Sequence, residues 1–320
     1  MDAIICTHEA DLDGICCAAI GLLKYQNASI SFCNYGKENF KTMLDMLIEQ
    51  TKRIRDGIII VSDLGINPDV VTQTISSINK IKESKWEMFW VDHHPWPTEA
   101  NSISSYINTI HDISGKKCAS DLMCDYFMPS SSTAKELSQI AHTTDFMSDD
   151  VYVPPIPELI QYYRTFSDAN ERLLVLTYKI AKGTFWDVEM QQEYMEYLKI
   201  SKLKRKEALE SMVIKKICDY KVAFVMTSKY LQSSIFADEI MKETFADLVF
   251  LYDSYGKVSI RRSNQAISCD KIANFLNEGG GHPFAAGGRL NDFVDRAKCQ
   301  EELENAFRKF LQPPMKNKKG

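Results

Sequence analysis

The 320-residue sequence predicts an α/β protein with a mainly parallel sheet, followed by a long helix and a smaller second α/β domain. Three observations support this fold class. Short apolar segments alternate with longer helical segments up to about residue 83, as in strand–helix–strand units. Strong helix formers with many charges run from Trp186 to Lys216, which indicates one long connecting helix. Further segments of strand character follow that helix.

The first domain begins with three strand–helix pairs, which predict a parallel sheet with helices on both faces. Asn67 and Pro68 have the composition of a helix start, because asparagine caps the first amides and proline suits the first helical position. We expect strands at residues 3–6, 29–33 and 57–61, and helices at 14–24, 38–49 and from 67 to the polar run at 82–85.

The remainder of the first domain is less regular. Pro95 and Pro97 prevent a helix from following the next strand directly. A proline-rich stretch at residues 154–157 marks an irregular break, after which helices resume near Glu158. We expect strands at 87–91 and 106–110, and helices at 119–127 and 134–140.

The composition places the domain boundaries around the charged helical run. We expect a first domain over residues 1–185, a helical linker over 186–218, a second domain over 219–315 and a disordered tail over 316–320. In the second domain we expect strands at 222–226, 248–252 and 257–261, and helices at 270–276 and 295–311.

Four stretches combine carboxylates or imidazoles with the end of a strand or helix. They are His8 with Asp11 and Asp13, Asp63, Asp92 with His93 and His94, and Asp145. Ligand crevices of open parallel sheets lie at the carboxyl ends of the strands, so we expect one shared site. Carboxylates and histidines without a cysteine pair favour manganese or magnesium over structural zinc, and these carboxylates suffice for two ions.

The order of these motifs resembles the DHH phosphoesterase family. The resemblance extends to the C-terminal run from Ser259 to Ser263 and the run from Gly279 to Gly288, which look like the family's substrate-binding DHHA1 domain. It implies a catalytic DHH domain, two divalent metal ions and hydrolysis of a phosphoester. Manganese is the expected ion, with magnesium and cobalt as alternatives.

The resemblance also implies roles for individual residues. One metal would be held by His8 and Asp11, the other by Asp13, with Asp63 bridging both. Asp92 and His93 would belong to the metal shell together with Asp145, whereas His94 would face the substrate. A role for Asp92 in orienting His93 is the alternative. The residues expected to be catalytic are Asp13, Asp63, His93 and His94.

A second group of residues predicts phosphate recognition in the C-terminal domain. Gly279, Gly280 and Gly281 offer backbone amides and close approach, and His282 adds a side-chain donor. Arg261 or Arg262 would supply a bidentate fork. Neighbouring strand residues face opposite sides, so one arginine faces the site and the sequence does not say which.

Composition narrows the partners and the compartment. A net charge of −5 argues against coating a long duplex nucleic acid, and favours a short or small phosphodiester. The nine cysteines lack C-x-x-C spacing, as expected of reduced, buried thiols. No stretch approaches the roughly 20 apolar residues of a membrane helix, and no signal peptide opens the chain, so we expect a cytoplasmic protein without a membrane partner. The oligomeric state, a homodimer included, stays open.

These features predict a manganese-dependent phosphodiesterase or exonuclease that hydrolyses short oligonucleotides by a two-metal mechanism, most similar to the nano-RNases and oligoribonucleases. One alternative is a phosphodiesterase or phosphatase for a small nucleotide, such as a cyclic mono- or dinucleotide or an adenosine bisphosphate. A minor alternative, from another class, is a non-catalytic nucleotide-binding module.

Overall fold

The computed structural model describes residues 2–53, 56–291 and 295–312. The chain divides into two compact units, Met1–Tyr194 and Met195–Gly320, and each is described by itself. The expected disordered tail at 316–320 lies outside the described residues, and the domain boundaries drawn from composition stay predictions. Among the helices of the described residues, none is long and apolar enough to cross a membrane.

The first unit contains a five-stranded, wholly parallel sheet, which confirms the predicted fold class. Its order is β2-β1-β3-β4-β5. The strands are β1 (Asp2–His8), β2 (Ser29–Cys33), β3 (Asp56–Ser62), β4 (Lys85–Asp92) and β5 (Asn108–His111). The order reverses between β1 and β3, and in open parallel sheets such a reversal opens a crevice at the carboxyl ends of the strands.

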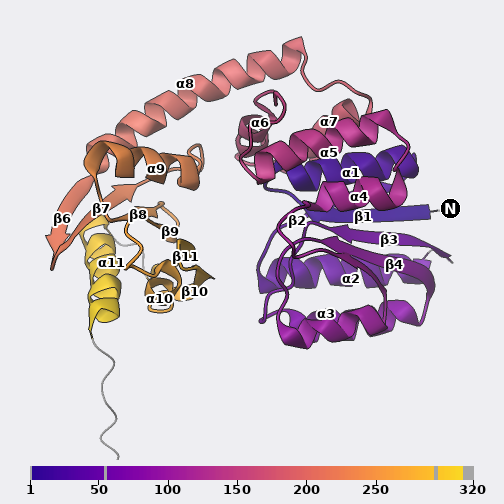
Figure 1. The fold of residues 1–320 in the computed structure, drawn as a ribbon, viewed down its shortest axis with the longest axis horizontal. Coiled ribbons are helices and arrows are strands. Elements are labelled where there is room, and N and C mark those ends of the chain that lie inside the picture. Colours follow the sequence, from indigo (N-terminus) through magenta and orange to yellow (C-terminus); the bar gives the residue numbers. More distant parts are fainter. Residues whose placement is uncertain (1, 54–55, 292–294, 313–320) are drawn as a thin grey trace, which may run out of the picture. The chain divides into compact units, whose positions relative to one another are not determined.

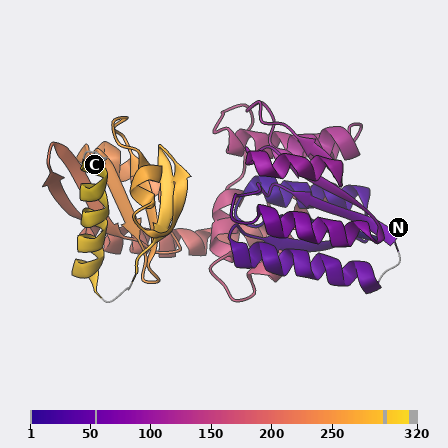
Figure 2. The same ribbon diagram turned by 90° about the horizontal axis from the view of Figure 1, so that it is seen from below.

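Helices cover both faces of this sheet (Figures 1 and 2). On one face, α2 (Lys37–Arg53), α3 (Val71–Lys82) and the 3-10 helix η1 (Thr98–Ser105) pack on β1, β3 and β4 around the buried Trp90. On the other, α1 (Leu12–Lys24) packs against the strands and against α4 (Ala119–Phe127), α5 (Ser132–Asp145) and α7 (Ala169–Ala181). α6 (Ile156–Tyr163) follows the proline-rich break and contacts α7. Because both faces are covered, the central strands read as continuous apolar runs.

The start of α3 differs from the predicted one. The helix begins at Val71, and its cap position, Val70, makes no side-chain capping bond. The Val70 amide instead donates to the Asn67 carbonyl over 3.1 Å, so Asn67 and Pro68 belong to a turn that precedes the helix. The composition was that of a helix start, but here the same residues form a β-turn.

The long helix α8 (Val188–Ser211) is shorter than predicted. Residues Val213–Ile217, expected to be helical, form strand β6, which pairs antiparallel with β7 (Tyr220–Met226). Val213, Lys215 and Ile217 alternate with more exposed residues, and this period of two fits a half-buried strand. The lysines between the apolar residues had favoured a helix on composition alone.

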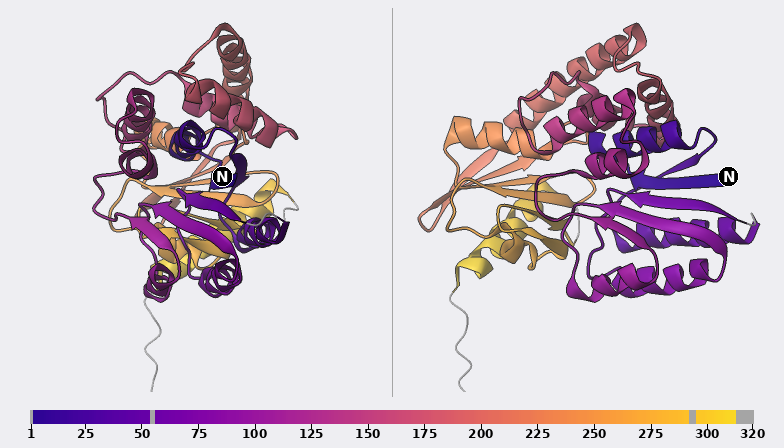
Figure 3. Two further views of the ribbon diagram at one scale, coloured as in Figure 1. Left: turned by 90° about the vertical axis from the view of Figure 1, so that its right-hand side faces the viewer. Right: turned by 45° about the vertical axis from the view of Figure 1, so that its right-hand side comes forward.

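The second unit contains a mixed six-stranded sheet of order β10-β11-β9-β8-β7-β6, in which only β7 and β8 are parallel. On one face, the core lies against α10 (Cys269–Ala273) and α11 (Arg296–Leu311); on the other it lies against α9 (Ser233–Thr244) and the end of α8 (Figures 1 and 3). The remaining strands are β8 (Leu248–Tyr252), β9 (Lys257–Arg262), β10 (Asn277–His282) and β11 (Ala285–Arg289). The glycine triplet at residues 279–281 therefore lies on an edge strand.

Candidate functional site

The predicted ligands of the first unit gather at the carboxyl edge of its sheet. His8 is the last residue of β1, Asp63 follows β3 directly, and Asp92 ends β4. Asp13 lies in the first turn of α1, and Asp145 is the last residue of α5. Residues up to about 140 positions apart in the sequence thus meet beside the reversal in strand order, as expected.

A close approach of α1 to β1 positions the first motif. A Cβ atom on Gly14 would lie 2.2 Å from the His8 carbonyl oxygen, so only glycine fits there. The Asp11 carboxylate caps α1 by accepting from the Gly14 amide over 3.2 Å. Its other oxygen lies 3.0 Å from His8 Nδ1. His8 and Asp11 therefore form a pair, with His8 buried and Asp11 half exposed.

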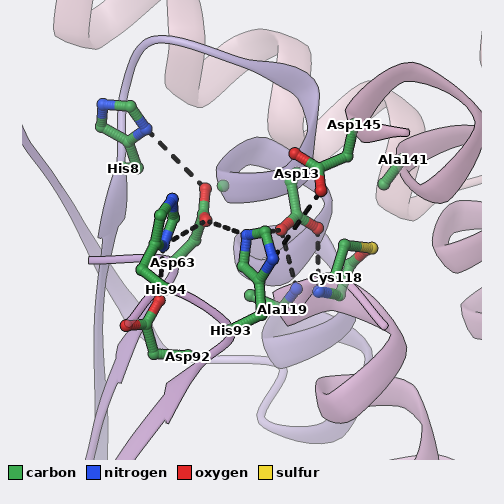
Figure 4. Close-up of polar contacts among 12 residues, drawn as sticks. His8, Asp13, Asp63, Asp92, His93, His94, Cys118, Ala119, Ala141 and Asp145 are labelled. Carbon is green, nitrogen blue, oxygen red and sulfur yellow. Dashed lines mark hydrogen bonds and ion pairs between the residues drawn. The ribbon is translucent and has the colours of Figure 1, made fainter. Parts of the chain in front are cut away.

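Asp63 lies between the histidines of the first and third motifs (Figure 4). Its Oδ2 is 3.8 Å from His8 Nδ1, and its Oδ1 is 3.5 Å from His93 Nε2. The side chain is only 2% exposed. Its backbone has a φ of 55°, in the left-handed region that a residue other than glycine rarely adopts. Such strain persists where the surrounding structure imposes it, and here it occurs at the carboxylate that lies between His8 and His93.

His93 is surrounded by three carboxylates (Figure 4). Besides Asp63, its Nε2 is 3.8 Å from Asp13 Oδ2 and its Nδ1 is 3.8 Å from Asp145 Oδ2. These separations are too long for direct hydrogen bonds. Groups of this kind that converge without bonding to one another are typical of a cation site.

Asp13 is held by the first amides of α4. Its two oxygens each accept one backbone hydrogen bond of 2.8 Å, from Ala119 and Ser120. A carboxylate is favoured at the amino end of a helix, where unpaired amides and the helix dipole are positive. This contact fixes the orientation of the Asp13 side chain, which is 2% exposed.

Asp92 is placed differently from the other carboxylates. It is fully buried, with one oxygen 2.8 Å from His94 Nδ1 and the other accepting from Trp96 Nε1 over 2.6 Å. Both oxygens are thus engaged by protein donors. These contacts give Asp92 an orienting role, which the sequence analysis held as the alternative to metal binding. The histidine that Asp92 orients is, however, His94 and not His93.

Electrostatics in the first unit reflect the crowding of carboxylates. Burial, and then the charges of Asp11, Asp13 and Asp92, raise the pKa of Asp63 well above its ordinary value. Burial and the charge of Asp13 also raise the pKa of Asp145 to about 6, although His93 opposes this shift. A nearby cation would relieve the repulsion in each case.

The side chains fit a divalent metal ion. Asp63 Oδ2 and His93 Nε2 are buried without a hydrogen-bond partner in the described structure. A buried carboxylate oxygen in this state is costly unless it faces a cation. Within the described residues, two groups with converging ligand atoms share Asp63: one with His8 and Asp11, the other with His93 and His94. Their hard oxygen and imidazole donors suit manganese or magnesium.

Sequence reasoning missed residues that shape this centre. The Tyr35 ring contacts both His8 and His94, with centroids 5.0 and 6.2 Å away, and its hydroxyl accepts from the Gly65 amide. Nothing in the sequence near Tyr35 marks it, because it follows β2 and carries no motif. The amides of Ala119 and Ser120 have no side-chain signature either.

In the second unit, Arg261 and His282 lie in one row across three strands. Arg261 on β9 is opposite Ala285 on β11, which is opposite His282 on β10. Directly opposed residues share a face of the sheet, so the guanidinium and the imidazole flank a small alanine on that face. Both arginines donate to backbone carbonyls: Arg261 to those of Ile260 and Ala286, and Arg262 to those of Gln265 and Ile267, by which Arg262 holds its own turn. The contacts favour Arg261 as the arginine beside His282.

The three glycines of β10 differ in what their backbone requires. A Cβ on Gly279 would lie 1.8 Å from the Ala273 carbonyl oxygen, and Gly281 has a φ of +136°. Only at Gly280 is there open space. The exposed rings of His282 and Phe284 lie nearly parallel, with centroids 5.4 Å apart. The strand thus presents two flat side chains beside a backbone of minimal bulk.

The fold and the centre define a class: a parallel α/β domain with a carboxylate–histidine cation site, joined to a second mixed α/β unit. Residues 2–147 match the DHH family, N-terminal domain, and residues 214–313 match the DHHA1 domain. The two matches cover most of the chain, which belongs to the DHH phosphoesterase family. Members of this family are metal-dependent phosphoesterases. No curated protein matches the chain.

Two solved structures share the fold over almost the whole chain. An exopolyphosphatase-related protein from Bacteroides fragilis is 14% identical with a TM-score of 0.55, covering 97% of this chain and 92% of the other. A pGpG-specific phosphodiesterase from Vibrio cholerae is 12% identical with a TM-score of 0.54, covering 97% and 99%. At this level of identity, the similarity shows the fold alone.

Proposed function

We propose that the protein is a manganese-dependent phosphodiesterase that hydrolyses short oligonucleotides in the manner of a nano-RNase. The observation that carries this proposal is Asp63, which is buried, strained, short of one hydrogen bond and shared by two clusters of metal-ligand type. A carboxylate in this position is suited to bridge two cations. Two-cation centres are suited to phosphoester hydrolysis.

In this proposal the side chains of the first unit divide into two groups. His8 and Asp11 would hold one ion and Asp13, His93 and Asp145 the other, with Asp63 between them. Two divalent ions there would supply an activated water and neutralise the charge that develops on the phosphate. Asp92, which also accepts from Trp96 Nε1, holds the His94 ring in place by its contact with Nδ1. Burial lowers the pKa of His94, but the hydrogen bond to Asp92 and the charge of that carboxylate outweigh burial and raise the pKa. A cationic His94 is suited to bind a phosphate oxygen.

The second unit would bind the remote part of the substrate. Arg261 and His282 offer donors on one face of the sheet, and the glycine strand lets a ligand approach the backbone closely. The parallel rings of His282 and Phe284 suit a flat group such as a base. Such a surface is adequate for one or two nucleotides.

Two further considerations favour a short substrate. The chain carries a net charge of −5, which opposes binding to long nucleic acids. One protein of the same fold is a phosphodiesterase specific for pGpG, a linear dinucleotide. The same comparison favours a second candidate function, a phosphodiesterase or phosphatase dedicated to a single small nucleotide.

A turnover panel in manganese tests these proposals. It would compare dinucleotides, RNA and DNA of increasing length, cyclic dinucleotides and an adenosine bisphosphate at equal concentration. A steep preference for RNA of two to about five nucleotides is expected. Preference for a single nucleotide would replace the proposal by the second candidate. No turnover of any substrate, with nucleotide binding unaffected by Asp63→Ala, would indicate the non-catalytic module.

A further inference from the structure

We infer that Asp121 is a positioning residue for one of the two metal ions, acting through Asp13 and Asp145. This inference rests on the proposed metal centre. Asp121 belongs to no motif of the sequence analysis, lies in the first turn of α4, and does not touch the proposed ligands in the described structure. Its contacts nevertheless connect α4, whose first amides hold Asp13, with α5, which carries Asp145.

The first connection runs from Asp121 to Asp13. The Asp121 carboxylate accepts from the Cys118 amide over 3.0 Å and so fixes the first turn of α4. The next two amides of that turn, Ala119 and Ser120, are the donors to Asp13. If the turn frays, both donors move away from the Asp13 oxygens, because they are fixed in the same backbone.

The second connection runs from Asp121 to the helix that ends at Asp145. Asp121 accepts a short hydrogen bond from the Ser138 hydroxyl on α5. It also accepts from Nδ1 of His142, over 2.6 Å and one turn before Asp145. One carboxylate therefore ties the α4 terminus, which holds Asp13, to α5, which carries Asp145. These two ligands flank His93 on opposite ring nitrogens.

The state of Asp121 supports this role. Burial alone would raise the pKa of Asp121, but the bonds from His142, Ser138 and the Cys118 amide outweigh it and lower the pKa. Because donors from both helices engage its two oxygens, an ionised Asp121 acts as a clamp. The group of Cys118, Asp121 and His142 has metal-ligand chemistry, but here both Asp121 oxygens accept hydrogen bonds from protein donors.

Asp121→Asn tests the inference, because the amide is nearly isosteric but cannot accept from every donor. Manganese titrations without substrate should show that one ion binds about 10- to 100-fold more weakly while the other keeps its affinity, the scale for residues that orient metal ligands. Asp125→Asn is the matched control, since Asp125 lies on the same helix and its carboxylate pairs with the exposed Lys117. Ser138→Ala, which removes one of the two bonds from α5 to Asp121 and leaves that of His142, should shift the same ion by a smaller factor.

Amide hydrogen exchange provides a readout that needs no metal. In Asp121→Asn, the Ala119 and Ser120 amides should exchange at least several-fold faster, with the strand amides of β1 and β3 unchanged. Unchanged affinity for both ions together with unchanged exchange would overturn the inference. Equal weakening of both ions would also do so, because it indicates a general structural role. If the wild-type protein bound no manganese, the proposed function would fail, and the exchange rates would still decide whether Asp121 holds the Asp13 donors.

Discussion

The candidate site of the first unit is mostly buried and leaves Asp63 Oδ2 and His93 Nε2 without a hydrogen-bond partner in the described structure, whereas His282 and Phe284 of the second unit are exposed. Asp63 has an unpaired oxygen and a pKa raised by burial and by neighbouring carboxylates. His282 ends the edge strand β10, and Phe284 lies in the turn that follows it. The first unit thus carries unfavourable charge that a cation relieves, while the second is stable without ligand. Substitutions should therefore trade stability against function only in the first unit.

The largest effect is expected for Asp63→Asn. Turnover in manganese should fall by roughly 10³-fold or more, because the carboxylate shared by both clusters is lost. The metal-free protein should keep or gain thermal stability, since one buried negative charge beside Asp11 and Asp13 is removed. Rates and melting curves in excess chelator measure the two quantities. Asp56→Asn, at the exposed start of the same strand, is the control. Severe unfolding of Asp63→Asn alone would show that Asp63 is structural.

The next effect is a pH dependence that comes from Asp145. Its pKa is raised to about 6, chiefly by burial and by Asp13. The pKa of Asp145 is higher in the folded protein than in the unfolded chain, where it is near 4, so protonation of this carboxyl favours the fold. The stabilisation is complete below pH 4 and is lost as the pH rises through 6. A pKa raised from near 4 to about 6 corresponds to roughly 3 kcal/mol, and solvent screening of this partly exposed carboxyl reduces the loss to about 2 kcal/mol, or several degrees in the melting temperature.

Asp145→Asn should remove that part of the pH dependence. In chelator, the variant should melt at or above the wild-type temperature at pH 7, and the gap should close toward pH 4. Saturating manganese should reverse the order at pH 7, because only the wild type keeps this carboxylate for the ion. If the difference in melting temperature between the wild type and Asp145→Asn is the same at pH 4 and pH 7, the raised pKa of Asp145 is contradicted.

How far the sequence predicted the molecule depends on whether a feature is local. Strands such as Ser29–Cys33 and Leu248–Tyr252 were predicted with their observed ends, because the alternation of serines with apolar residues in the first and the continuous apolar run in the second are local signals. Val213–Ile217 was missed because its two adjacent lysines continue the charged composition of the preceding helix. Pairing with β7, across residues 218 and 219, decides in favour of a strand, and the composition of the run does not show that pairing.

The same distinction holds at the site. The strand-end carboxylates and histidines could be located because the carboxyl edge of a parallel sheet collects them. The contacts that orient them could not. Asp13 is held by amides more than 100 residues away, and Tyr35 contacts His8 and His94 through packing alone. Backbone donors and packed rings leave no motif, so only the fold shows them.

In the second unit, His282→Ala should have a smaller and more selective effect. If His282 binds a remote phosphate or base, kcat/KM for a dinucleotide should fall roughly 30-fold. This corresponds to a loss of about 2 kcal/mol in transition-state stabilisation, the scale of one charge-assisted hydrogen bond. Hydrolysis of bis(p-nitrophenyl) phosphate, which offers no nucleotide, should barely change. Lys257→Ala on the same sheet is the control. An equal loss for both substrates would place His282 in the chemical step instead.

The smallest effect is expected for Phe284→Ala. Its ring is 60% exposed and lies parallel to that of His282 at an offset of 5.4 Å between centroids, so it can be removed without opening the core. Stacking with a base at such an exposed site contributes about 1 kcal/mol, which corresponds to a KM some 5-fold higher with kcat unchanged. The increase should be larger for purine than for pyrimidine dinucleotides, because a purine covers more of the ring. Phe284→Tyr should restore the wild-type KM. If both variants keep it, the base does not stack on Phe284, and recognition in the second unit rests on the phosphate alone.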